Sequence, residues 1–154
     1  MVRSPSLHES PLLDGLSVRQ RELFGGLMEP QHFDEATLIF EQGGLARYLY
    51  LLESGKVIIR YKPYDGPPLQ VAEIGPGEVF GWSAVLNRVA YTSSAMAMEE
   101  SLAYRINIDN LKKLCASYPQ SSATLLERLA QLANVRAPNA HQEVIAILQS
   151  GLAA

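Results

Sequence analysis

Cysteine is almost absent from this chain of 154 residues, because Cys115 stands alone. A single cysteine cannot form an intramolecular disulfide, so the fold needs no oxidising compartment. We interpret Cys115 as a small buried hydrophobic residue on a helix rather than as a reactive thiol. No apolar run approaches the roughly 20 residues of a membrane-spanning helix, and residues 1–5 lack the apolar core of a signal peptide. The sequence therefore predicts a cytoplasmic protein with no membrane partner.

Histidine is also scarce, and the three histidines lie far apart. His8, His32 and His141 form no His-x-His or His-x-x-x-His pair, so we expect no metal site. A cupin-type metalloenzyme is disfavoured for the same reason, since it needs clustered His and Glu residues on barrel strands. No motif supports a Ser-His-Asp or a Cys-His catalytic set. We therefore expect no catalytic residues and predict that the protein is not an enzyme.

Excess positive charge is missing as well, since the net charge is -3 and the pI is about 5.6. Lys and Arg residues are scattered rather than arranged in a stripe, which argues against direct binding of nucleic acid. Only 19 residues follow Val135, enough for one short helix but not for a helix-turn-helix domain. With 47% hydrophobic and 19% charged residues, the composition is typical of one globular domain.

The chain divides into a helical start, a β-rich middle and a helical end. Residues 1–10 are polar and are predicted to form a flexible N-terminus. In residues 12–28 the apolar positions recur at helical spacing, with Ser17 as the predicted N-cap and Gly25-Gly26 as the stop. In residues 31–107 short runs rich in Val, Ile, Tyr and Phe alternate with Gly, Pro and Asp turns. This spacing is typical of an all-β sandwich or barrel.

Eight of these runs are predicted to be strands, which fits a jelly-roll β-barrel, also called a double-stranded β-helix. They are residues 32–34, 37–41, 48–53, 56–62, 69–74, 78–80, 91–98 and 101–107. The fold class is therefore mainly β with flanking helices. Gly55, after Ser54, is expected to take a positive φ in a tight hairpin between the third and fourth strands.

The helical period returns after Asn107. One helix is predicted to begin at Asn107 or Asp109 and to stop at Pro119, which lacks a backbone donor. A second runs from about residue 119 to residue 136 and carries an apolar stripe. The stripe consists of Leu125, Leu126, Leu129, Leu132 and Ala133. It either packs on the barrel or pairs with its copy in a second chain, and we favour a homodimer through this helix. Residues 137–154 are predicted to form an extra C-terminal helix or tail.

Residues 74–95 combine a turn, a short strand and a short helix. Gly75 and Gly77 bracket Pro76 in a tight turn, a short β-prone piece follows, and Gly81 opens a small amphipathic segment that ends before Tyr91. A glycine that frees backbone N–H groups at the start of a short helix provides a place for an anion. We therefore expect any ligand site to lie in this stretch.

The ordered motifs of the chain resemble the cyclic-nucleotide-binding domain. This domain is the sensor module of catabolite-activator-type regulators, of cyclic-nucleotide-gated channels and of the regulatory subunits of protein kinase A. The resemblance covers residues 12–135, and its motifs are residues 38–43, 51–55 and 75–81. It implies one such domain over residues 11–136, with the β-barrel in about 31–107 and the C-terminal helices in about 108–136.

Residues 74–95 resemble the phosphate-binding cassette of that family, but its two charged positions differ. Phe80-Gly81 match, as do Ala84-Val85-Leu86 and Thr92-Ser93. Trp82 stands where the family has a ribose-binding Glu, and a gapless count puts Tyr91 at the phosphate-binding Arg. Losing one charge-assisted hydrogen bond in a pocket costs roughly 1.5–3 kcal/mol. Binding of cyclic AMP or cyclic GMP is therefore expected to be weak or altered.

Eight residues of the cassette are the predicted ligand-binding residues. They are Phe80, Gly81, Trp82, Ser83, Arg88, Tyr91, Thr92 and Ser93. Arg88 either replaces the missing Arg or lies in solvent, and Trp82 either stacks on a ligand or fills the pocket. Alternation along a strand predicts that only two of residues 91–94 face the pocket.

Two functions fit these features. The first is a stand-alone sensor or regulatory module, in which a cyclic nucleotide or another small ligand shifts the C-terminal helices and alters a contact with a partner protein. The second is a ligand-free protein–protein interaction module whose pocket is plugged by Trp82. We favour the first, because the backbone pattern of the cassette is retained.

Overall fold

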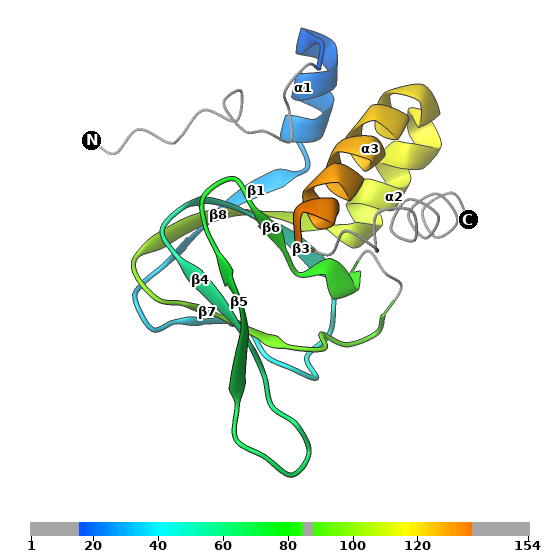
Figure 1. Ribbon diagram of the computed structural model, residues 1–154. Helices are drawn as coiled ribbons and strands as arrows, with labels where there is room; N and C mark the ends of the chain where they lie inside the picture. The colour runs from blue at the N-terminus through cyan, green and yellow to red at the C-terminus, as the bar shows by residue number, and fades with distance from the viewer. Residues whose placement is uncertain (1–15, 85–87, 137–154) are drawn as a thin grey trace.

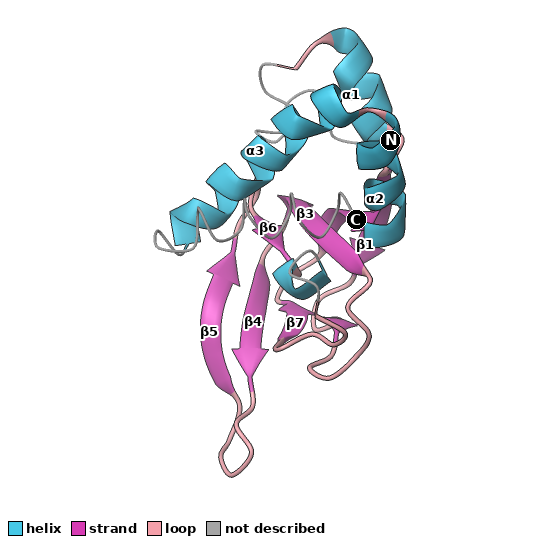
Figure 2. Cartoon of the chain, turned by 90° about the vertical axis from the view of Figure 1, so that its right-hand side faces the viewer, coloured by secondary structure: helices cyan, strands magenta, loops and turns pink. Residues whose placement is uncertain are grey.

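The computed structural model describes residues 16–84 and 88–136, except for the side chains of residue 126 and residues 129–136. Within these ranges three helices gather at one end of a two-layered β-sandwich, and a hairpin of two strands projects from the other end (Figures 1 and 2). The predicted flexible N-terminus, residues 1–10, and the predicted extra C-terminal helix, residues 137–154, lie outside the described residues.

Helix α1 (Val18–Gly25) begins where the sequence predicts. Ser17 is its N-cap and forms a capping box with Gln20. The Gln20 N–H donates to Ser17 Oγ at 3.1 Å, and the Ser17 N–H donates to Gln20 Oε1 at 3.0 Å. These two bonds satisfy backbone donors that the first turn of a helix leaves free. Phe24 anchors the helix, since its side chain is 1% exposed.

Two four-stranded antiparallel sheets form the sandwich, and this confirms the predicted eight-stranded jelly roll. The first sheet has the order β1 (Met28–Phe33), β8 (Ser101–Asn107), β3 (Tyr48–Ser54), β6 (Val79–Phe80). The second has the order β2 (Leu38–Phe40), β7 (Ser94–Ala97), β4 (Val57–Tyr61), β5 (Leu69–Ile74). A 3-10 helix, η3 (Trp82–Ala84), follows β6.

Two predicted strand starts are wrong by three residues or more, and the other strand limits agree to within one residue. Strand β1 begins at Met28 rather than at residue 32, and it contains Pro30. Because β1 lies at the edge of its sheet, proline is tolerated there. Strand β7 begins at Ser94 rather than at Tyr91. The Tyr91 backbone bonds instead to the turn at Gly43 and Gly44, with both N···O distances at 2.9 Å.

Strand β3 explains why the first sheet is apolar on both faces. Leu49 and Leu51 belong to the apolar cluster that includes helix residues, whereas Tyr50 and Leu52 belong to the cluster of strand residues from both sheets. Successive side chains of a strand point to opposite faces, so one strand supplies both clusters. The continuous apolar run of residues 48–52 is the sequence signal of this double burial.

The C-terminal helices cover the first sheet (Figure 2). Helix α2 (Ile108–Ser117) has Asn107 as its N-cap, and helix α3 (Pro119–Arg136) follows directly. Cys115 is buried on α2, as predicted, and burial raises the pKa of its thiol. Leu125 of α3 is 1% exposed and packs in the same cluster. No helix in the described part of the chain is long and apolar enough to cross a membrane.

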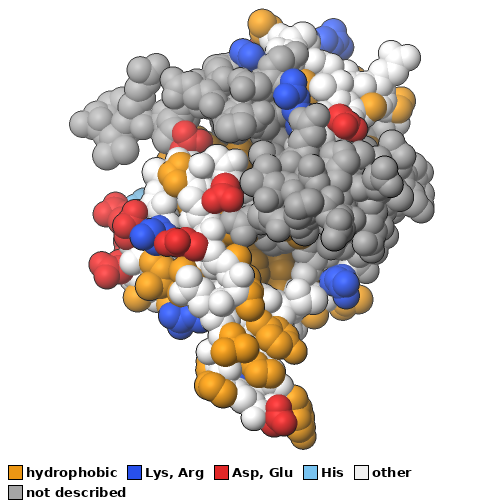
Figure 3. Space-filling model, viewed as in Figure 1, with side chains coloured by type: hydrophobic (Ala, Val, Ile, Leu, Met, Phe, Trp, Pro, Cys, Tyr) orange, Lys and Arg blue, Asp and Glu red, His pale blue; other side chains and the backbone are white. Residues whose placement is uncertain are grey.

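The hairpin of β4 and β5 extends away from the helices and carries exposed apolar side chains (Figure 3). They include Tyr61, Tyr64, Leu69 and Val71. The predicted hairpin tip at residues 65–68 joins the two strands. Ile59 of β4 and Ile74 of β5 line a cavity beside the hairpin.

Candidate ligand pocket

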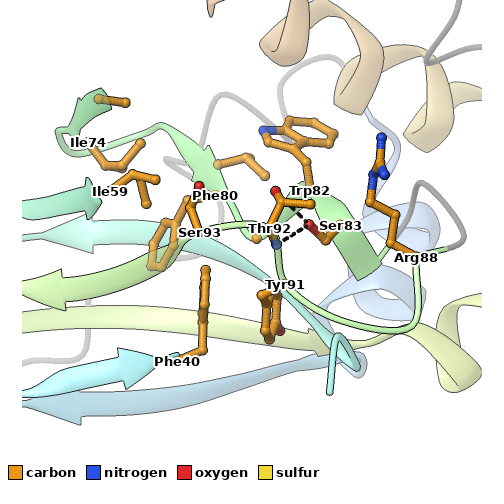
Figure 4. Close-up of a pocket in the computed structure, with 13 residues that line it drawn as sticks. Phe40, Ile59, Ile74, Phe80, Trp82, Ser83, Arg88, Tyr91, Thr92 and Ser93 are labelled. Carbon is orange, nitrogen blue, oxygen red and sulfur yellow. Dashed lines mark hydrogen bonds between the residues drawn. The ribbon is translucent and has the colours of Figure 1, made fainter. Parts of the chain in front are cut away.

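A cavity of about 310 Å³ opens beside the cassette. Thirteen residues line it, and all eight of the predicted ligand-binding residues are among them. The other five are Phe40, Ile59, Ala72, Ile74 and Val79. The fold therefore brings the predicted residues together around one space (Figure 4), although ligand binding by each of them stays a prediction.

Gly81 lines the cavity at the turn between β6 and η3. Its φ is +85°, and a Cβ added there would lie 3.0 Å from the Tyr48 carbonyl oxygen and 3.3 Å from Tyr50 Cδ1. Only glycine takes this conformation in so little space without strain. The Ala84 N–H donates back to the Gly81 carbonyl at 3.3 Å, which closes the short turn of η3. The amphipathic segment predicted to reach residue 90 is helical only over Trp82–Ala84 among the described residues.

Trp82 lies on the wall of the cavity and does not fill it. The indole is partly buried against the apolar cluster beneath the helices and also lines the cavity. A volume of about 310 Å³ remains open next to it. Of the two roles considered for Trp82, the geometry fits the aromatic wall on which a flat ligand can stack.

Ser83 and Thr92 join the two sides of the cassette. The Thr92 N–H donates to Ser83 Oγ at 3.3 Å, and the two hydroxyl oxygens lie 3.5 Å apart (Figure 4). Ser83 is only 8% exposed, whereas Thr92 is exposed. The Arg88 N–H donates to the Ser83 carbonyl at 3.1 Å, so Ser83 bonds to both Arg88 and Thr92.

Tyr91 lines the cavity and also packs in the hydrophobic core. Its ring stacks on Phe40 with a centroid separation of 3.8 Å, and only 5% of the residue is exposed. Its hydroxyl donates to the Tyr48 carbonyl at 2.6 Å and accepts from the Tyr48 N–H at 3.2 Å. Burial raises the pKa of Tyr91 to about 12, so the donating proton is retained at neutral pH. The structure thus commits this hydroxyl to the backbone rather than to a ligand.

Arg88 is exposed at one end of the cavity. In Figure 4 its side chain points the same way as Trp82, on the side away from Ile59 and Ile74. No carboxylate of the described residues lies within 4.0 Å of its guanidinium. A cation that has no carboxylate partner among the described residues and lies at the rim of a cavity can contact the anionic group of a ligand.

The apolar floor is the part of the site that the sequence did not reveal. Phe40 stacks on Tyr91 and on Phe80, while Ile59 and Ile74 come from the two strands of the projecting hairpin. Three of residues 91–94 line the cavity, not two, because residues 91–93 precede β7 and do not alternate as a strand does. Ile59, Ala72 and Ile74 carry no motif, and the pairing of β4 with β5 brings them together here.

Among the described residues, no group of three or more His, Cys, Asp and Glu side chains is arranged to hold a metal ion. His32 lies at the surface on β1, away from the cavity. Its Nε2 is 2.8 Å from Glu100 Oε1, and its Nδ1 is 3.8 Å from Asp34 Oδ1.

Comparison with known proteins agrees with the fold. The family model of the cyclic nucleotide-binding domain matches residues 30–118. This chain belongs to the cyclic nucleotide-binding domain family. Among curated relatives of this domain, the cyclic AMP receptor protein of Thermus thermophilus is 30% identical over 125 residues, which are 81% of this chain and 53% of that protein. A CRP-like cAMP-activated global transcriptional regulator of Mycobacterium tuberculosis is 31% identical over 104 residues, which are 68% of this chain and 46% of that protein.

Solved structures show the same cyclic nucleotide-binding fold. The catabolite activator protein of Thermus thermophilus superposes with a TM-score of 0.71 at 28% identity, over 90% of this chain and 63% of that one. A cyclic nucleotide-binding domain from Methylobacillus flagellatus superposes with a TM-score of 0.75 at 19% identity, over 85% and 74% of the two chains. The chain thus spans about half the length of the curated relatives named above, at 53% and 46%.

Proposed function

We propose that this domain is a sensor or regulatory module whose cavity holds a small ligand. The observation that carries the proposal is the open cavity of about 310 Å³ lined by all eight predicted cassette residues. Ligand sites in proteins are typically concave and mostly apolar, with volumes of about 300–1,000 Å³ and a few placed polar groups. The ligand-free alternative requires Trp82 to plug the pocket, and the open volume beside the indole favours the sensor.

A path from the cavity to the C-terminal helices supports a regulatory role. Trp82 and Ala84 of η3 pack against the cluster that contains Leu111 of α2 and Leu125 of α3. A ligand that contacts Trp82 therefore lies next to a segment that packs in the same apolar cluster as both helices. If η3 takes a different position with ligand bound, the helices shift and change the surface that a partner protein meets.

Cyclic nucleotides are the first ligands to test, because the relatives above carry cyclic AMP in their names. We expect isothermal titration to show weak binding of cyclic AMP and cyclic GMP, since Trp82 offers no acceptor to a ribose hydroxyl. For the same reason 2′-deoxy cyclic AMP should bind as well as cyclic AMP. Absence of heat from all three at millimolar concentration would leave a different ligand or none. A marked loss with the deoxy form would show that another residue binds the ribose.

The homodimer predicted from the apolar stripe of residues 125–133 stays a proposal. We propose a homodimer through α3, although Leu125 is buried within the chain and the side chains of residues 129–136 are not described. We expect sedimentation equilibrium to give twice the mass of one chain, 16.9 kDa. A single-chain mass at high protein concentration would exclude the dimer. A cytoplasmic location and a role without catalysis also stay predictions.

A further inference from the structure

The charges around the cavity are unequal. Arg88 is the one charged side chain among the described residues that line it, and no Asp or Glu is present there. One cation can neutralise one anionic group, whereas a second negative charge would find no partner in this lining. The lining therefore favours a ligand with a single negative charge.

The apolar and cationic parts of the lining lie at opposite ends. Figure 4 shows Ile59 and Ile74 at one end, Arg88 at the other and Trp82 between them. Phe80, which is 1% exposed, adds an aromatic surface near the apolar end. A ligand that satisfies both ends is amphipathic, with its apolar body on the isoleucines and the indole and its anionic group at Arg88.

Three of the four hydroxyl groups of the lining, on Tyr91, Ser83 and Thr92, have partners already, which leaves only the Ser93 hydroxyl without a hydrogen-bond partner among the described residues. Tyr91 uses its hydroxyl as donor and acceptor with the Tyr48 backbone. Ser83 Oγ accepts from the Thr92 N–H at 3.3 Å and lies 3.5 Å from the Thr92 hydroxyl. Because a buried hydroxyl without a partner is costly, a sugar gains little in this cavity.

These observations lead to a specific ligand class. We infer that the cavity selects an amphipathic monoanion without a sugar, namely a carboxylate with an aromatic or branched apolar body. Its carboxylate lies at Arg88, and its body lies between Trp82 and the pair Ile59 and Ile74. The inference rests on the proposed function, because it assumes that the cavity holds a ligand, and it names the chemistry of that ligand.

Three probes of similar shape test the selection. They are 4-phenylbutyrate, 4-phenylbutan-1-ol and 4-phenylbutylamine, which differ in the charge at one end. Trp82 is the single tryptophan of the chain, so its fluorescence reports on the cavity directly. We expect saturable changes, with the acid bound about fivefold more tightly than the alcohol, because Arg88 is exposed and its ion pair is screened. The amine should bind more weakly than the alcohol, and high salt should reduce the preference for the acid.

Two variants separate the charged end from the apolar end. In Arg88→Gln the affinity for the acid should fall to that for the alcohol, and the affinity for the alcohol should not change. Arg19→Gln is the matched control, because it removes the same charge from the exposed face of α1 and should change neither affinity. Ile59→Ser should weaken the acid and the alcohol alike, by up to about tenfold, since the lost contact is apolar. The unfolding midpoint of each variant confirms that it is folded.

The outcomes distinguish this inference from the proposed function. Equal affinity for the acid and the alcohol, or an unchanged acid affinity in Arg88→Gln, would overturn the inference. Binding of cyclic AMP more tightly than 4-phenylbutyrate would also overturn it, while the proposed sensor function would stand. Absence of saturable binding with all probes and with cyclic AMP would remove both.

Discussion

Replacing Gly55 with alanine is expected to destabilise the fold strongly. The loss should exceed that from replacing any exposed residue of the barrel. Gly55 has a φ of +98° in the β3–β4 turn, and an added Cβ would collide with Ser101 Oγ and lie 2.7 Å from the Glu100 carbonyl oxygen. Ser101 is 1% exposed and holds this turn, because its Oγ accepts from the Lys56 N–H at 3.2 Å. Backbone strain and overpacking together should lower the free energy of unfolding by about 3–5 kcal/mol.

Gly43→Ala is the matched control for this experiment. Gly43 also has a positive φ, +89°, but an added Cβ there meets no atom within 4 Å. The free energy of unfolding of the control should therefore fall by only about 1–2 kcal/mol, which is the cost of placing alanine in the left-handed region. Urea unfolding of both variants measures the difference. Equal losses would show that the collision with Ser101 is relieved at no cost, and the packing described for this turn would be wrong.

Replacing Tyr91 with arginine is expected to unfold or strongly destabilise the domain. Tyr91 is 5% exposed, and its ring lies on Phe40 at 3.8 Å between centroids. A guanidinium in this place would be a buried charge without a partner and would also lose the two hydrogen bonds to Tyr48. We expect a loss of about 3 kcal/mol or more in the free energy of unfolding.

Thr92→Arg is the matched variant one residue further along. Thr92 is exposed and lines the cavity, so its replacement should change the free energy of unfolding by only about 0.5 kcal/mol. Its guanidinium would lie beside the cavity and should strengthen binding of cyclic AMP, because it supplies a second cation for the phosphate. A stable Tyr91→Arg variant that binds cyclic AMP tightly would instead show that Tyr91 occupies the position of the family arginine.

The sequence predicted the fold well because its signals are local. Gly55 ends a hairpin strand, Ser17 and Asn107 cap helices, and the strands read as apolar runs between turns. The predicted start of β1, residue 32, lies after the observed start at Met28, because Pro30 looks like the end of a strand. Proline fits only if the strand is known to lie at the edge of a sheet. Edge position is a property of the whole sheet, and no local pattern shows it.

The sequence predicted eight of the residues that line the cavity but not their orientation, and their binding of a ligand stays a prediction. The motif around Gly81 located the cavity, yet a gapless count could not show that Tyr91 packs on Phe40 rather than facing a ligand. Ile59 and Ile74 were missed because they reach the cavity only through the pairing of β4 with β5. Long-range contacts of this kind depend on the tertiary fold.

Amide chemical shifts in a two-dimensional nitrogen–proton spectrum test most directly whether this cavity is the ligand site and is coupled to the helices. On titration with 4-phenylbutyrate and with cyclic AMP, we predict saturable shifts at Gly81, Ser83 and Thr92, together with smaller shifts along α2 around Leu111. Shifts confined to the projecting hairpin, or no saturable shifts at Gly81 and Ser83 with either compound, would contradict the account.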